Sequence, residues 1–97
     1  MIKIRVLSNK EIIVQKGENF ISDMDGEKVM LSIQNGKYYN LGEIGGEIWE
    51  RIKDSISISE LVTTLVSEYD VERSQCEDQV ISFIQRLIQE DLIERYE

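Results

Sequence analysis

The stretch Lys28–Leu41, which reads KVMLSIQNGKYYNL, carries the clearest structural signal in the chain. Its two flanking runs, residues 28–33 and 38–41, are rich in β-branched and aromatic residues. Asn35 and Gly36 lie between them, and Asn-Gly between two β-prone runs is the strongest short signal for a hairpin. The sequence therefore predicts a β-hairpin that ends in Tyr38-Tyr39-Asn40-Leu41.

Two registers fit this hairpin. A two-residue loop pairs Ile33 with Tyr38, whereas a three-residue loop with a bulge at Lys37 pairs Ile33 with Tyr39. The second register gathers five apolar residues on one face: Val29, Leu31, Ile33, Tyr39 and Leu41. We favour it because a one-residue slip would invert the faces. In either register the two tyrosines point to opposite faces, so one of them is exposed.

Upstream of the hairpin the chain also has strand character. Ile2, Ile4 and Val6 alternate with polar residues, residues 12–14 form a short β-prone run, and residues 20–21 form another. Alternation with period two is typical of strands. Residues 1–41 are thus expected to form an antiparallel sheet.

Downstream the periodicity changes to that of helices, which we expect at about 43–53, from Ser57, and from about 72 or 74 to 90. Ser57-x-x-Glu60 matches a capping box, and Ser74-x-x-Glu77 is a second match. Gly45-Gly46 lies inside the first helix, where paired glycines are costly unless another part of the chain approaches closely. Trp49 is expected in the core, and residues 91–96 are expected to return as an extended segment.

The amino-acid composition excludes several classes of function but does not identify one. The 97 residues suit a single domain, 1–97, with a net charge of −8, one cysteine and no histidine. The missing histidine removes the commonest general base and nearly all zinc sites, and no cofactor or metal is expected. The acidic charge disfavours nucleic acid binding. No apolar run is long enough for a membrane span and no signal peptide is apparent, so a cytoplasmic location is expected. Cys76, on the apolar side of the third helix, is expected to be a buried thiol.

The third helix has an apolar arc wider than docking on one layer requires. At 100° per residue an ordinary core stripe is formed by Phe83, Cys76, Leu87, Val80 and Ile84, and Ile88 and Ile81 extend it to one side. One interpretation is a more deeply buried helix. The other is that Ile81, Ile84 and Ile88 line a groove beside the last hairpin strand, 37–41, which is an edge strand with only one charge. An open edge beside an apolar groove is how some domains bind extended peptides by strand addition.

A series of short motifs from Gly36 onward resembles a known family. These are GKYYNLGxxGxxIWE at 36–50, SISELV at 57–62, EYDV at 68–71 and DQVISFIQRLIQEDLI at 78–93. Their order and spacing resemble the PqqD-like leader-recognition domains of ribosomally made, modified peptides, and most closely the small stand-alone leader-binding proteins of lasso-peptide clusters. Gly42 departs from the family, which usually has Asn there, and Asp91 stands where Gly is common.

The resemblance implies an α+β, winged-helix-like fold, with a three-stranded antiparallel sheet followed by three helices. It implies no catalysis. It implies binding of the leader segment of a precursor peptide as an added strand, between strand three and helix three, and presentation to a cysteine-protease-like leader peptidase and an ATP-dependent cyclase. The candidate peptide contacts are Lys37, Tyr38, Tyr39, Asn40, Leu41, Glu77, Val80, Ile81, Ile84 and Ile88. Glu77 is included as a partner for a basic leader.

Three alternatives stay open. One is a chaperone like PqqD itself, which serves a radical S-adenosylmethionine enzyme. A second is a DNA-binding winged helix, opposed by the excess of acidic residues on the third helix. The third is an enzyme, opposed by the lack of histidine and of catalytic motifs.

Overall fold

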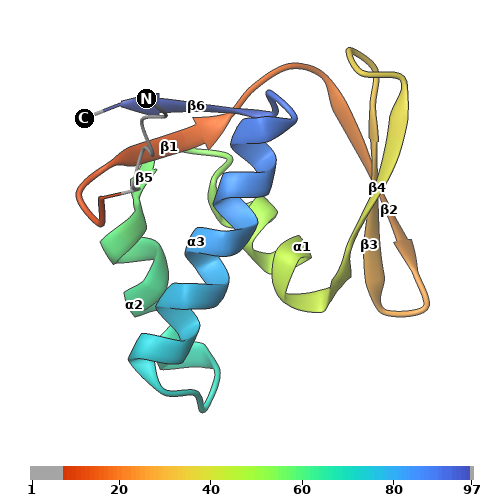
Figure 1. The fold of residues 1–97 in the computed structure, drawn as a ribbon. Coiled ribbons are helices and arrows are strands. Elements are labelled where there is room, and N and C mark those ends of the chain that lie inside the picture. Colours follow the sequence, from red (N-terminus) through yellow and green to blue (C-terminus); the bar gives the residue numbers. More distant parts are fainter. Residues whose placement is uncertain (1–7, 97) are drawn as a thin grey trace, which may run out of the picture.

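The computed structural model describes residues 8–96, which form three helices and six strands (Figure 1). The elements in chain order are β1 (Ile12–Gln15), β2 (Asn19–Met24), β3 (Glu27–Ser32), β4 (Lys37–Leu41), α1 (Gly42–Arg51), β5 (Ile56–Ser57), α2 (Ile58–Glu68), α3 (Arg73–Gln89) and β6 (Ile93–Tyr96). The mixed α+β class is as predicted. The expected strand at Ile2–Val6 lies outside the described residues.

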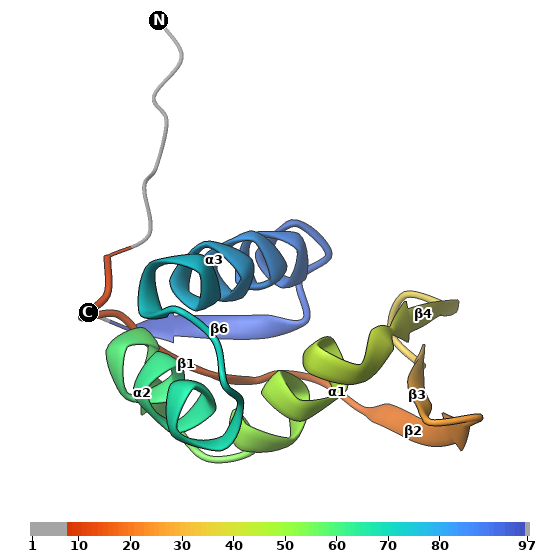
Figure 2. The ribbon, with the colours of Figure 1, turned by 90° about the horizontal axis from the view of Figure 1, so that it is seen from below.

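The strands form two separate antiparallel sheets rather than one. The first has the order β2-β3-β4, and the second has the order β5-β1-β6. Residues 12–14, expected within a single N-terminal sheet, instead lie at the centre of the second sheet as β1. The returning tail forms β6, as predicted, and supplies one neighbour of β1; the link between α1 and α2 supplies the other, β5. Figure 2 shows α3 running above β6, with the first sheet at the far end of α1.

The core lies between the helices and the inner faces of both sheets. Its largest fully buried side chains come from β1, β3 and all three helices: Ile13, Met30, Ile48, Ile52, Ile58, Leu61, Leu65, Ile84, Val62 and Val80. Trp49 and Cys76 also belong to this core, as predicted. Among the described residues no helix is long and apolar enough to cross a membrane.

The hairpin forms where predicted, but both predicted registers are wrong. Ser32 pairs with Lys37 and Met30 with Tyr39, so the loop has four residues, 33–36. The Ser32 carbonyl accepts a hydrogen bond from the Gly36 amide at 2.8 Å, and the Ser32 hydroxyl accepts one from the Asn35 amide at 3.1 Å. Gly36 has φ of 64°, which glycine adopts without strain. These bonds close the wider loop.

This register sorts the side chains differently from the prediction. Tyr39 and Leu41 share the inner face with Met30, whereas Val29 and Leu31 lie on the outer face with Tyr38. One tyrosine is nevertheless exposed and the other half-buried, as expected. The first sheet therefore has apolar residues on both faces.

The helix starts illustrate which local signals were reliable. The Ser57 hydroxyl accepts a hydrogen bond from the Glu60 amide at 3.1 Å, so the first capping box is confirmed. The second is wrong, because α3 begins at Arg73 with Glu72 before it and no side-chain cap.

Gly45 and Gly46 allow the close approach that their position predicted. A Cβ at Gly45 would lie 2.8 Å from Cε1 of Phe83 on α3, and one at Gly46 would overlap the side chain of Lys28 on β3. Helix α1 can therefore contact α3 on one side and the first sheet on the other.

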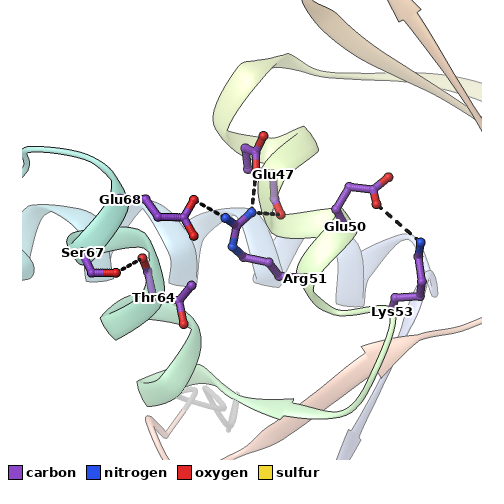
Figure 3. A network of polar contacts seen from close by, with 7 residues as sticks. All are labelled: Glu47, Glu50, Arg51, Lys53, Thr64, Ser67 and Glu68. Atoms are coloured by element: carbon purple, nitrogen blue, oxygen red, sulfur yellow. Dashed lines mark hydrogen bonds and ion pairs between the residues drawn. The ribbon is translucent and has the colours of Figure 1, made fainter.

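Polar contacts fix the remaining element pairs. Figure 3 shows Arg51 on α1 between Glu47 of the same helix and Glu68 at the end of α2, bonded to both carboxylates. In the second sheet the buried carboxylate of Glu11 binds the Arg95 guanidinium on β6, with 2.8 Å between Nε and Oε1. The same carboxylate accepts a hydrogen bond from the Ser8 amide at 2.9 Å, so its charge is well compensated.

Candidate functional site

The first sheet ends in an open edge at β4. Within residues 8–96 this strand pairs with β3 alone, so its other side has backbone N–H and C=O groups available for pairing. It has neither proline nor a bulge to block addition of a strand. Lys37, at its start, is the single charged residue.

A shallow pocket separates this edge from α3. Its walls are Tyr39, Asn40 and Leu41 of β4 and, on or after α3, Phe83, Arg86, Leu87, Glu90 and Leu92. The enclosed volume is only about 20 Å³, enough for one small group. A peptide that adds to a sheet is bound mainly by backbone hydrogen bonds, so an open edge beside an apolar pocket suffices for it.

A network of hydrogen bonds closes one end of this β4–α3 pocket. The Tyr39 hydroxyl donates to Oε1 of Glu90 at 2.7 Å, and the Asn35 side-chain amide donates to the Tyr39 hydroxyl at 3.0 Å and to the Glu90 carbonyl at 2.9 Å. The Lys37 ammonium lies 3.7 Å from the same Glu90 carboxylate. The loop and the end of α3 are thereby held together, and the distance between β4 and α3 is fixed.

The charge at the pocket is mixed, although the whole chain is acidic. Glu90 is engaged by Tyr39 and Lys37, whereas Arg86 on the helix side is exposed. Among the described residues no carboxylate lies within ion-pair distance of Arg86. Within the described part of the chain, the pocket therefore presents the Arg86 guanidinium at its rim without an ion-pair partner.

The residues predicted on the strand side fall at this site. Tyr39, Asn40 and Leu41 line the pocket, Lys37 borders it through Glu90, and Tyr38 lies on the same strand but points to the opposite face. The predicted exposed aromatic is thus Tyr38, whose side chain points away from α3.

The residues predicted on the helix side are not at this pocket. Val80 and Ile84 are completely buried, and Ile81 and Ile88 are partly buried against the core. On a helical wheel Phe83, Arg86 and Glu90 lie on the flank of α3 opposite to Ile81 and Ile88. Ile81 and Ile88 pack against the hydrophobic core, so their flank of α3 is partly covered, and α3 also contacts β6 of the second sheet.

Glu77 also lies elsewhere. It is in the first turns of α3, where its carboxylate accepts a hydrogen bond from the Asn9 side chain at 3.2 Å. Thirteen positions separate it from Glu90, about 20 Å along a helix, so it is not positioned to attract a peptide to the pocket.

Five wall residues were not predicted as contacts from the sequence: Phe83, Arg86, Leu87, Glu90 and Leu92. One signal was present, because Gly45-Gly46 predicted a close approach and Phe83 is the side chain that approaches Gly45. Phe83 is half-buried rather than fully in the core. No local pattern marks the polar flank of an amphipathic helix as a binding surface.

A second pocket lies farther along α3. It has a volume of about 110 Å³ and is lined by residues of α1, α2, α3 and the link before α3: Ile44, Leu65, Tyr69, Val71, Cys76 and Gln79. Burial raises the pKa of the Cys76 thiol, which reduces the thiolate fraction at neutral pH. Cys76 is buried, as predicted.

Comparisons with known proteins give two matches. Residues 27–93, from β3 through the start of β6, match the family described as coenzyme PQQ synthesis protein D (PqqD). A solved structure, "TbiB1 in Complex with the TbiA(beta) Leader Peptide", is 27% identical, with a TM-score of 0.74 over 87% of this chain and 98% of that chain. No curated protein matches. The family match spans more than half of the sequence and includes β4, α3 and the pocket between them, and on this basis the chain belongs to the PqqD family.

Proposed function

We propose that this protein is a non-catalytic recognition domain that binds the leader segment of a ribosomally made precursor peptide. The leader adds as a fourth strand to the free edge of β4 and packs against α3. The observation that carries the proposal is the open edge of β4 beside an apolar pocket. The likeness to TbiB1, whose structure is of a complex with a leader peptide, supports it.

The pocket defines what the leader presents to α3. Side chains of an added strand alternate, so every second residue faces Leu41, Phe83 and Leu87. An apolar or aromatic side chain suits this wall. A carboxylate two residues farther along the leader strand suits Arg86. We therefore propose an acidic leader residue at this position, in place of the basic leader that the net charge predicted.

The contacts proposed for the leader follow from this geometry. On the strand side they are Lys37, Tyr38, Tyr39, Asn40 and Leu41, with Tyr38 beside leader residues that face outward. On the helix side they are Phe83, Arg86 and Leu87. Four residues predicted as contacts act indirectly, by packing α3 against the core: Val80, Ile81, Ile84 and Ile88. Glu77 does not contact the leader.

The wider biological role is proposed on the family resemblance. The domain, 1–97, has a winged-helix-like arrangement, is cytoplasmic, and delivers the precursor to a leader peptidase and an ATP-dependent cyclase of a lasso-peptide system. The alternative partner is a radical S-adenosylmethionine enzyme, as for PqqD itself. The genes beside this one distinguish the two.

The experiment is a peptide titration with two proline variants. Successive residues of a strand direct their N–H groups to opposite edges, so Lys37 and Asn40 donate to different edges of β4. Proline removes the donor. We expect Lys37→Pro and Asn40→Pro to differ: the one that removes the outward donor stays folded but binds the leader at least about tenfold more weakly, and the other loses stability.

Alanine at the same positions is the matched control, since it keeps the backbone donor. Calorimetric titration gives the leader affinity and a thermal melt gives the stability of each variant. If both folded proline variants bind the leader as tightly as their alanine counterparts, strand addition at β4 is wrong.

A further inference from the structure

The outer face of the first sheet is apolar, and no element of residues 8–96 packs over it. Phe20, Leu31 and Tyr38 lie directly opposite one another on β2, β3 and β4. Val29 is on the same face in the next row, and Met24 is on it at the far end of β2. Phe20 and Met24 are each 60% exposed and Tyr38 is 74% exposed. We call these five residues the outer patch; it faces away from α1 and α3 and is separate from the pocket on the inner face.

The charges of the three strands are sorted between the two faces. Both lysines of the sheet, Lys28 and Lys37, are on the inner face, where they pair with Asp23 and Glu90. On the outer face Glu27 stands opposite Met24, and Asp25 follows in the turn. The outer patch therefore has an acidic border at its Met24 end and no lysine or arginine from its own strands.

From this distribution we infer that the outer patch is the docking surface for a partner protein whose contact area has an apolar centre bordered by Lys or Arg. Exposed apolar patches that include two aromatic side chains are typical of protein interfaces. A second copy of the chain would place the acidic border against itself, and an anionic membrane surface would repel it. Only a basic partner complements both the apolar and the charged parts.

The position of β4 points to the kind of partner. This strand carries Tyr38 on the outer patch and the free edge where the leader is proposed to add. A protein docked on the outer patch would stand directly beside the bound leader. The partner is therefore an enzyme that processes the precursor; this inference rests on the proposed function and adds the surface used for delivery.

Phe20 separates the two surfaces experimentally. It lies on β2, and with strands about 4.8 Å apart it is about 14 Å from a strand added at β4, too far for contact. A change at Phe20 therefore tests the outer patch without touching the leader. Glu27→Lys tests the acidic border at an exposed position that does not affect the core.

The experiment measures binding of the purified peptidase and cyclase, each in turn, to the chain with and without leader. We expect Phe20→Ser and Glu27→Lys each to weaken binding of one enzyme by about tenfold or more, while leader affinity stays within about twofold. Tyr96→Ser is the matched control, because Tyr96 is a half-exposed aromatic residue on the other sheet.

Three results would overturn the inference. They are binding of neither enzyme to the unmodified chain, enzyme binding unaffected in both folded variants, and sedimentation showing a dimer that Phe20→Ser dissociates. Failure of the proposed function can be told apart from failure of this inference, because the first appears as a lack of leader binding by the unmodified chain. Enzyme binding measured without leader still tests the outer patch.

Discussion

The two sheets of this small protein each have three antiparallel strands but differ in exposure. In the β5-β1-β6 sheet Ile13 is completely buried, Ile93 is nearly so, and the Glu11–Arg95 ion pair is largely shielded from water. In the β2-β3-β4 sheet only one face meets the core, and the other exposes Phe20 and Tyr38. The family match covers β3 and β4 of the first sheet, whereas in the second sheet it covers β5 and only the first residue of β6.

This difference separates stability from recognition. The sheet built from the chain ends and the α1–α2 link is sealed by helices and stabilises the core. The hairpin sheet stands at the end of α1, keeps a free edge and contributes the strand side of the pocket (Figures 1 and 2). Exposed apolar residues and an open edge favour aggregation in a protein without a partner. The hairpin sheet combines both features with the pocket against α3, and for that reason we propose it as the recognition element.

The largest expected effect is a core truncation in the sealed sheet. Ile13→Ala removes a fully buried side chain and should lower the free energy of unfolding by about 2–5 kcal/mol. Phe20→Ala, in the open sheet, should lower it by about 0.5 kcal/mol or less, because this side chain is already mostly exposed. Urea unfolding of both variants measures the difference, and equal losses would contradict the division between the sheets.

The next effect concerns the buried carboxylate of the sealed sheet. Glu11→Ala removes the partner of Arg95 and the acceptor for the Ser8 amide, and should cost about 2–3 kcal/mol of unfolding free energy. Glu50→Ala is the control, since its ion pair with Lys53 is exposed and should contribute less than about 1 kcal/mol. A Glu11 variant as stable as the Glu50 variant would show that this pair does not hold β1 to β6.

A smaller effect is expected where the open sheet joins α3. Tyr39→Phe removes the hydroxyl that donates to Glu90 and accepts from Asn35, at a cost of about 1 kcal/mol in unfolding free energy. Leader affinity should fall as well, because the bond fixes the distance between β4 and α3. Tyr38→Phe, whose hydroxyl makes no hydrogen bond to another described residue, should change neither quantity. Melts and titrations of the pair separate the two tyrosines.

The smallest effect is a pH dependence at the junction of the sheets. Asp91 accepts from Lys16, between β1 and β2, at 2.8 Å and from Gln34, in the β3–β4 loop, at 3.3 Å. The hydrogen bond from Lys16 lowers the pKa of the Asp91 carboxyl below its ordinary 3.8. The carboxylate therefore adds stability above that value, and the contribution is lost as the pH falls through the lowered pKa.

Asp91→Asn tests this junction while keeping a residue that tolerates the positive φ of 60°. The variant should be slightly less stable than the unmodified chain at pH 6–8, and the difference should shrink in acid. Thermal melts between pH 2 and pH 8 report it. A difference that stays constant across this range would mean that Asp91 acts through its backbone conformation alone.

Local sequence rules predicted the elements and failed where long-range contacts decided. The hairpin, the Ser57 cap and the need for Gly45-Gly46 each depend on residues close in sequence or on backbone sterics. The register depended instead on Asn35, whose side chain bonds to Glu90, 55 positions away. An Asn-Gly pair normally indicates a short turn, and this tertiary contact favours the wider loop.

The strand side of the pocket was predicted from the sequence, whereas its helix side was not, for a related reason. The edge strand 37–41 could be recognised because its five residues show two faces and lack any blocking residue. The flank of α3 that lines the pocket could not be recognised, because Ile81 and Ile88 on the other flank look as suitable for a groove as for a core. In the structure these two isoleucines pack against the core, and helical periodicity contains no information about what covers a helix.

The most direct test of the central claim is amide hydrogen exchange of the chain with and without a leader peptide. Addition of a strand to β4 should slow exchange of alternate amides within Lys37–Leu41, those that point away from β3, and leave the free edges of β2 and β6 unchanged. Slowed exchange at β2 or β6 without a change at β4, or no change at any strand edge while the peptide binds, would contradict the account.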